Sequence, residues 1–314
     1  MTAVAMMTSE LDARSRSIAP ELKTMSIVVA SDGSESAFAA FKAATLIKAR
    51  NNAEIHVLTV LEPMPAMFPS VEGIIIPVEL DRSREEAQRT TVLEQMMPYD
   101  PASEWSLDIR LGRAAESIVD FAVESKADLI IVGLHRHGIV GRLLGEETAM
   151  AIARLSPVPL LVASPGMRRL PHRVMVAMDL RPDGLQCAPE ALAAIANAPS
   201  ISCVHVKPRS EFLGVDWVEF DRDYELAMRE RFSVLERQLD ELHLRPDLIV
   251  LHGEASHELT DFAAYSKAEL IVTGVRRRLG RSRATGGRMA AKIIRHAECS
   301  VLVVPSLYSP DPKS

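Results

Sequence analysis

The chain has 314 residues, of which 47% are apolar, 25% charged and only 4% aromatic, and its net charge is −6. This length allows two ordinary domains, each with a core built from Val, Ile, Leu, Ala and Met rather than from aromatic rings. The negative charge argues against a protein held on nucleic acid by a global positive field, and no apolar run approaches the length of a membrane span.

The first half is predicted to begin with a tail and to continue as alternating strands and helices. Residues 1–22 are expected to form a flexible N-terminal tail, because Met1–Met7 is too short for a signal-peptide core and lacks a basic start. Short β-branched strands are predicted over Ser26–Asp32 and Ile55–Val60, and another at the end of Ser125–Gly133. Helical stretches separate these strands, which is the pattern of βαβ units.

The second half repeats these elements in the same order. Arg173–Asp179 matches the first strand 147 positions later, and Ile201–Val206 matches the second. Ser266–Gly274 agrees almost residue for residue with Ser125–Gly133, 141 positions earlier. A repeated spacing across several landmarks indicates two copies of one structural unit.

Two segments differ between the copies. Residues 62–80, rich in Pro and Met, and the shorter segment 207–218 both follow the second strand of their half. That position is the carboxyl edge of the sheet, where open α/β folds bind ligands. Both segments are open to interpretation as lids or as surface loops.

The alternation of strands and helices predicts an α/β fold with two tandem Rossmann-like domains. Each domain is expected to be doubly wound, with a five-stranded parallel sheet and flanking helices, and a pseudo-two-fold axis should relate the two. We place the first domain at residues 23–166, the second at 167–306 and a C-terminal tail at 307–314.

The sequence carries no motif for common enzyme or metal chemistry. The turn after the first strand lacks Gly-x-Gly-x-x-Gly, and neither Gly-x-Ser-x-Gly nor His-Glu-x-x-His occurs. The three cysteines form no Cys-x-x-Cys pair, so a reduced, cytoplasmic setting is expected. His135 and His137 have only Glu146 as an obvious third ligand, so no metal site and no catalytic residue is predicted.

The order of these landmarks, from about Lys23 to Val304, resembles the universal stress protein family. The resemblance implies a five-stranded parallel α/β domain, often duplicated, and many members of the family bind ATP or AMP. It also implies that the last strands, Leu160–Val162 and Val301–Val304, meet across the axis and make the chain an intramolecular pseudo-dimer, with a further homodimer open. We expect two separate sheets rather than one continuous ten-stranded sheet.

The family binds phosphate with Gly, two residues, Gly, nine residues, Gly, then Ser or Thr. Glycines let backbone N–H groups turn toward phosphate oxygens, and the loop leads into a helix N-terminus that favours anions. In the second half this pattern falls on Gly274, Arg277, Gly287 and Arg288, with no acidic residue from Gly274 through Ala297. Arginine binds phosphate bidentately. An anion site in an Arg-rich loop is one interpretation, and a solvated basic loop is the other.

The first half departs further from the family pattern. Arg136 follows Gly133 where the second Gly belongs, and Glu146 and Glu147 fall on the final Gly and Ser/Thr positions. A carboxylate facing a phosphate weakens binding through like-charge repulsion. We therefore expect a degenerate nucleotide loop in the first domain.

The resemblance adds further positions around a nucleotide. The strand-ending aspartates would lie near ribose, phosphate or a metal, although Asp also caps helices well. The second strands would offer backbone groups to an adenine edge. The residues are Asp179, Val206 and Gly253 in the favoured second domain, with Asp32, Val60 and Gly112 as their counterparts in the first.

These observations predict a non-enzymatic stress-response protein that binds a small ligand or a protein partner, with an adenine-nucleotide (ATP or AMP) or anion site in the second domain. The first alternative is an ATP-binding switch with slow hydrolysis. The second has the Arg-rich loop docking to nucleic acid or to a phosphorylated partner, which a steep salt dependence would reveal.

Overall fold

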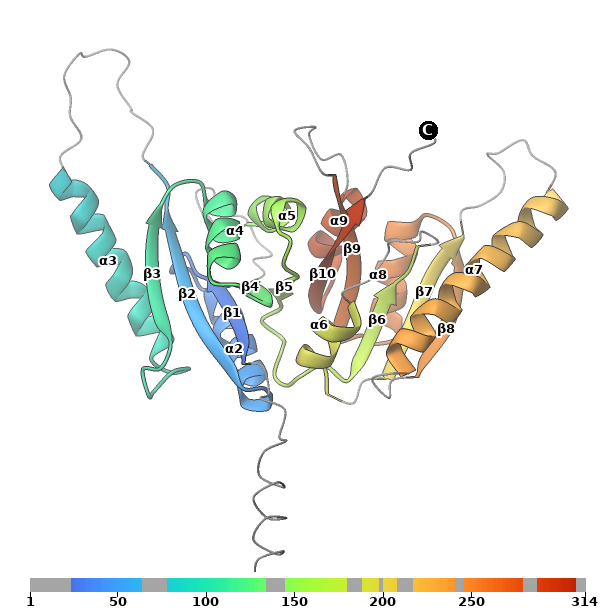
Figure 1. Ribbon diagram of the computed structural model, residues 1–314, viewed down its shortest axis with the longest axis horizontal. Helices are drawn as coiled ribbons and strands as arrows, with labels where there is room; N and C mark the ends of the chain where they lie inside the picture. The colour runs from blue at the N-terminus through green and yellow to red at the C-terminus, as the bar shows by residue number, and fades with distance from the viewer. Residues whose placement is uncertain are drawn as a thin grey trace, which may run out of the picture.

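The computed structural model describes residues 24–63, 78–133, 145–179, 188–197, 200–207, 217–240, 245–278 and 287–308. The two halves have the same plan of alternating strands and helices (Figure 1). The first half contains β1 (Met25–Ala30), α2 (Ala37–Arg50), β2 (Ala53–Leu61), α3 (Val78–Met96), β3 (Ser106–Leu111), α4 (Ala114–Glu124), β4 (Leu129–Gly133), α5 (Glu146–Leu155) and β5 (Leu160–Ala163). The second contains β6 (Arg173–Ala177), α6 (Ala188–Ile195), β7 (Ser200–Lys207), α7 (Trp217–Asp240), β8 (Pro246–His252), α8 (Ala255–Tyr265), β9 (Leu270–Arg278), α9 (Arg288–His296) and β10 (Ser300–Tyr308).

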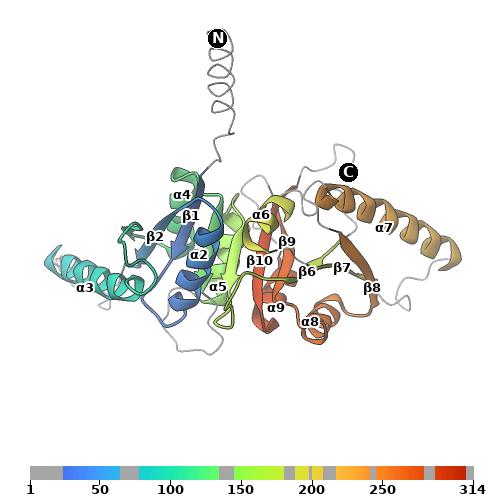
Figure 2. The same ribbon diagram turned by 90° about the horizontal axis from the view of Figure 1, so that it is seen from below.

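The central strands are buried on both faces, which explains their nearly continuous apolar sequences. In β1, Ile27 and Val29 enter one core cluster while Val28 and Ala30 enter the other. All five residues of β4 are buried. Helices supply the cover on each side: α2, α3, α6 and α7 pack on one face, and α4, α5, α8 and α9 on the other. Figure 2 shows this layering most clearly in the second half.

The strands form one sheet in the order β3-β2-β1-β4-β5-β10-β9-β6-β7-β8. Pairing is parallel within each half, and the halves join where β5 runs antiparallel to β10. The expected meeting of the last strands is confirmed: Leu161 lies opposite Leu302, its equivalent 141 residues later, so the local two-fold axis passes between them. The expectation of two separate sheets was wrong, because this pairing uses the edge backbone groups that would otherwise be exposed.

The last two strands of the second domain are longer than the sequence suggested. β9 continues through Arg278, which pairs with Tyr308 of β10. Arg276–Arg278 therefore belong to a strand rather than to the loop expected from Gly274, and Leu307 and Tyr308 belong to β10 rather than to a tail. Both strands extend because the backbone N–H and C=O groups of each are paired with those of the other over this extra length.

The predicted segments 62–80 and 207–218 lie mostly outside the described residues, so the choice between lid and surface loop stays open. Within the described ranges, none of the helices combines the length and the apolarity that crossing a bilayer requires.

Candidate functional site

The candidate sites lie at two switch points of the sheet, which are the points where the order of the strands reverses. In the first domain β1 lies between β2 and β4, and in the second β6 lies between β7 and β9. Ligands of open α/β sheets bind outside the carboxyl ends of strands at such points. Asp32 and Gly133 lie at the first switch point and Asp179 lies at the second, whereas Gly274 lies within β9 and pairs with Val304.

In the first domain Asp32 forms the turn between β1 and α2. Its Oδ1 accepts a hydrogen bond from the N–H of Ser34 at 2.9 Å, and Ser31 Oγ accepts from the N–H of Gly33 at 3.2 Å. The cap position of α2 is Ser36, so Asp32 does not itself cap the helix. Beside it, the space between Asp32, Val60 and the other described residues leaves no room for a water molecule.

Gly133 has a packing role that the sequence did not reveal. A Cβ built at this position would lie 1.8 Å from the backbone oxygen of Ser36. The end of β4 therefore touches the start of α2 so closely that a side chain does not fit. Arg136, the predicted second loop position, lies outside the described residues.

Gly112 and Gly253 take the same turn after β3 and β8. Both have φ of +152°, a conformation that side chains rarely adopt, so glycine is required by the backbone in both copies. After Gly253, the carboxylate of Glu254 accepts from Ser256 Oγ and from the N–H of His257 and so caps α8. These bonds, aided by Lys292, lower the pKa of Glu254 to about 2.

The acidic start of α5 faces the other domain. Arg295 of α9 donates to both carboxylate oxygens of Glu146, with Nη2 at 2.7 Å and Nε at 2.9 and 3.0 Å. This bidentate contact raises the pKa of Arg295. The Glu146 carboxylate, which the resemblance aligned with a phosphate-binding position, is thus paired with a guanidinium of the second domain.

A double-mutant cycle should detect this pair. Glu146→Gln and Arg295→Gln should each lower thermal stability slightly, and the double variant should lose less than the sum, because each single change already breaks the contact. The coupling should fall as salt is raised, since the Arg295 side chain is 62% exposed. Strict additivity at low salt would contradict the pairing.

The second domain has no acid at the equivalent helix start. Gly287, the counterpart of Glu146, adopts φ of +97° and caps α9, and no acidic residue lies in the first turn. Arg288 is the first helical residue and is exposed. A Cβ at Gly287 would lie 3.6 Å from Nε of Arg154, which stands in α5 where Arg295 stands in α9. Each helix start is therefore approached by an arginine of the opposite domain.

The Gly-x-x-Gly part of the expected loop is strand in the second domain. Gly274 pairs with Val304 and Arg277 with Leu307, so the backbone there bonds to β10. Residues 279–286, which lead into α9, lie outside the described residues. The structure thus brings together Gly287, Arg288 and Arg154, and Arg154 was missed because its position depends on the packing of α5 against α9.

A buried hydrogen-bond chain adjoins the second switch point. His205 Nδ1 lies 2.9 Å from the carbonyl oxygen of Met178, and His205 Nε2 lies 2.6 Å from the hydroxyl of Tyr224. A carbonyl only accepts, so Nδ1 carries the proton. Burial raises the pKa of Tyr224. These hydrogen bonds hold the backbone next to Asp179 and Val206 and satisfy both ring nitrogens of His205, which therefore has a structural role.

The described residues contain no group of three or more side chains suited to hold a metal ion. His135 and His137, the pair weighed from the sequence, lie outside them.

Comparison with known proteins gives matches to both halves. The model of the universal stress protein family matches residues 23–164 and again residues 171–305. A universal stress protein of Methanocaldococcus jannaschii is 29% identical over 108 residues, which make up 33% of this chain and 64% of that protein. Universal stress protein A homolog 1 of Coxiella burnetii is 29% identical over 101 residues, which make up 32% of this chain and 69% of that protein.

Solved structures match the tandem arrangement. A universal stress protein from Archaeoglobus fulgidus has a TM-score of 0.65 at 16% identity, covering 90% of this chain and 99% of that one. A functionally unknown protein from Pseudomonas aeruginosa has a TM-score of 0.55 at 17% identity, covering 91% and 94%. At such identities the likeness concerns the fold alone, and it confirms two tandem Rossmann-like domains.

Proposed function

The chain belongs to the universal stress protein family as a tandem member, and from this premise we propose that it is a non-enzymatic stress-response protein that binds one adenine nucleotide, ATP or AMP, through its second domain. The nucleotide phosphate would lie at the start of α9. The base and ribose would lie along the second switch point, near Asp179 and the backbone of Val206.

The observation that carries this proposal is the contrast between the two helix starts. In the first domain the Glu146 carboxylate already lies between the start of α5 and Arg295. In the second domain Gly287 replaces that acid, while Arg154 approaches from the other side. An external anion would take the place at α9 that the Glu146 carboxylate takes at α5.

Electrostatics supports an anion at this position. Arg288 lies in the first turn of α9, where the positive end of the helix dipole disfavours a cation. A phosphate between the helix start and the guanidinium groups would reverse that cost, because both the N–H groups and the arginines favour negative charge. The absence of the family's Ser/Thr hydroxyl argues for binding without hydrolysis.

Calorimetric titration with AMP and with ATP tests the proposal. We expect one site per chain, and Arg288→Ala should weaken binding by about tenfold, the effect of one charge-assisted contact. The same change should leave the unliganded protein equally or slightly more stable, because it removes an unfavourable charge. Arg89→Ala, an exposed site on α3, is the matched control.

Two outcomes would overturn the assignment. Two equivalent sites per chain would show that the first domain binds as well, despite Glu146 and Glu147. No binding at millimolar nucleotide would leave the protein as a partner-binding scaffold.

A further inference from the structure

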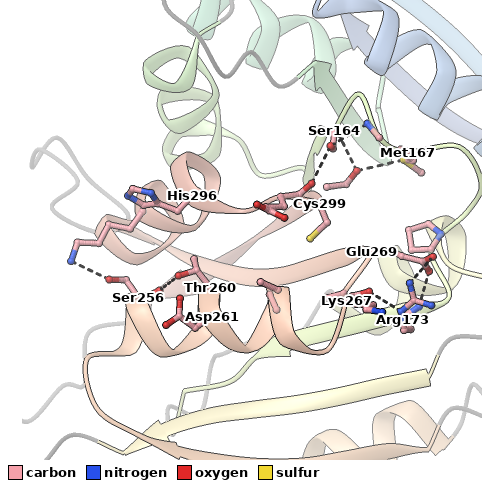
Figure 3. Close-up of a pocket in the computed structure, with 18 of the residues that line it drawn as sticks. Ser164, Met167, Arg173, Ser256, Thr260, Asp261, Lys267, Glu269, His296 and Cys299 are labelled. Carbon is pink, nitrogen blue, oxygen red and sulfur yellow. Dashed lines mark hydrogen bonds and ion pairs between the residues drawn. The ribbon is translucent and has the colours of Figure 1, made fainter.

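A groove of about 1000 Å³ lies between α8, α9 and the segment 164–173 that joins the domains (Figure 3). Its floor includes Cys299 and Ser300 at the start of β10, and Ala268 and Glu269 just before β9. This end of the groove therefore lies at the amino edge of these parallel strands, and the groove runs from there to Glu254 and Ser256 at the start of α8. The proposed nucleotide site lies at the carboxyl edge of the strands, so the end of the groove at the amino edge is separate from it.

The walls of the groove are held in place. The Glu269 carboxylate accepts hydrogen bonds from the N–H groups of His172 and Arg173 at 2.7 and 3.0 Å, and from the guanidinium of Arg169 at 2.8 Å. Farther along the segment, the N–H of Ser164 donates to Ser300 Oγ at 3.1 Å. The connecting segment is thus fastened at both ends to the second domain, and the groove does not need to be assembled by a ligand.

The floor of the groove is partly apolar, and most of the apolar side chains in it are alanines. Met167 is 7% exposed and Ala263 is 6% exposed, and Ala264 and Ala268 continue the same surface. Small side chains leave room above them. This combination suits a flat or extended organic body better than a bare inorganic ion.

Charge is distributed unevenly along the groove. Figure 3 shows Arg173, Lys267 and Glu269 gathered at one end and Ser256, Thr260 and Asp261 at the other. At the end near the start of α8 the ionisable side chains have partners, since Lys292 contacts Glu254 and His257 contacts Asp261.

The other end has an excess of positive charge. Arg169 and Arg173 share the single carboxylate of Glu269. Arg168 and Lys267 add two exposed cations, and Glu298 is the remaining acid among the described residues that line the groove. Four cations thus face two acids, and the excess lies beside the apolar floor.

We propose that this groove is a second ligand site, which binds a small organic anion with its carboxylate or phosphate at the end formed by Arg168 and Lys267 and its apolar body over Met167 and the α8 alanines. The site joins the connecting segment to α8 and α9. It is independent of the proposed nucleotide site, and its occupancy does not depend on whether AMP or ATP binds.

Cys299 gives a readout inside the groove. Its thiol is half-buried there, whereas Cys203 is fully buried and burial raises the pKa of Cys203 to about 12, so Cys203 should not react. Cys187 lies outside the described residues and is removed as Cys187→Ser. The alkylation rate of Cys299 is then measured with 1-naphthyl phosphate as probe, and with inorganic phosphate and 1-naphthol as its two halves.

We expect 1-naphthyl phosphate to slow alkylation saturably at a concentration where neither half does. The double change Arg168→Glu and Lys267→Asn should raise the concentration of 1-naphthyl phosphate that half-protects Cys299 by at least about tenfold. Asn suits position 267, where φ is +53°. Lys126→Asn is the matched control, because Lys126 occupies the equivalent position with φ of +50°.

A steric variant gives an independent test. Ala264→Trp should fill the groove and abolish protection while folding is retained, because residue 264 is exposed. Val123→Trp at the equivalent exposed position of α4 should leave protection intact. Absence of protection at millimolar probe, or protection unchanged in both groove variants, would overturn the proposal. Retained AMP binding in the groove variants would distinguish its failure from failure of the nucleotide site.

Discussion

Gly133→Ala should lower the free energy of unfolding of the first domain by about 3 kcal/mol or more, at the upper end of overpacking substitutions. The new Cβ would lie 1.8 Å from the backbone oxygen of Ser36. Neither atom belongs to a flexible side chain, so relief requires a shift of β4 or of the start of α2. Both elements are part of the buried core, where such shifts disrupt packing.

The equivalent glycine of the second domain is the control. A Cβ at Gly274 would lie 4.0 Å from the backbone oxygen of Val304, so Gly274→Ala should change stability by less than about 1 kcal/mol. Thermal and denaturant unfolding of both variants measures the difference. Equal effects would show that the two glycines share a role in both copies and that the contact with Ser36 does not decide it.

Glu269→Ala should lower the free energy of unfolding by about 2 kcal/mol at neutral pH. The carboxylate is 22% exposed and accepts four hydrogen bonds, two from backbone N–H groups and two from arginines, so its removal leaves several donors unsatisfied. Partial exposure moderates the loss, because solvent screens part of the charge interaction. The connecting segment should loosen first, which increased hydrogen exchange at His172 and Arg173 would show.

The same carboxylate predicts a pH dependence. Burial of Glu269 opposes its ionisation, but the hydrogen bonds from Arg169, Arg173 and His172 outweigh it and lower the pKa to about 2. A lowered pKa in the folded state means that the stabilisation is fully present above about pH 4.5 and is lost as the pH falls toward 2.

Glu269→Gln should therefore weaken the dependence of the free energy of unfolding on pH between pH 4.5 and about pH 2. The difference between wild type and variant isolates this group from Glu254, which titrates in the same range. Glu104→Gln is the control, because Lys48 lowers the pKa of Glu104 too, but at a largely exposed position. Parallel profiles for wild type and Glu269→Gln would contradict the role of Glu269.

Much of the fold was predictable because its signals are local and repeated. The β-branched strands that precede Asp32 and Asp179 show their periodicity within a few residues, and a second copy makes chance agreement negligible. The turn glycines at 112 and 253 could be placed for the same reason. Their left-handed backbone is a property of a short segment, so it leaves a mark in the sequence.

The candidate sites were less predictable, because they depend on contacts between distant parts of the chain. Arg295 reaches Glu146 across 149 residues, and Arg154 approaches Gly287 from the other domain. Alignment with the family motif predicted that Glu146 would oppose phosphate binding, but it did not show that Arg295 pairs with this acid.

The amino-acid sequence by itself determined the duplicated α/β unit, the aspartates that follow the first strand of each unit, and the asymmetry between an acidic and an acid-free helix start. Only the tertiary structure decided that the two sheets are continuous, that β9 extends to Arg278, and that segment 164–173 closes a groove against α8 and α9. The physical reason is that periodicity and turn chemistry act between neighbours in sequence. Strand pairing, ion pairs and cavities depend instead on which surfaces the folded chain brings together.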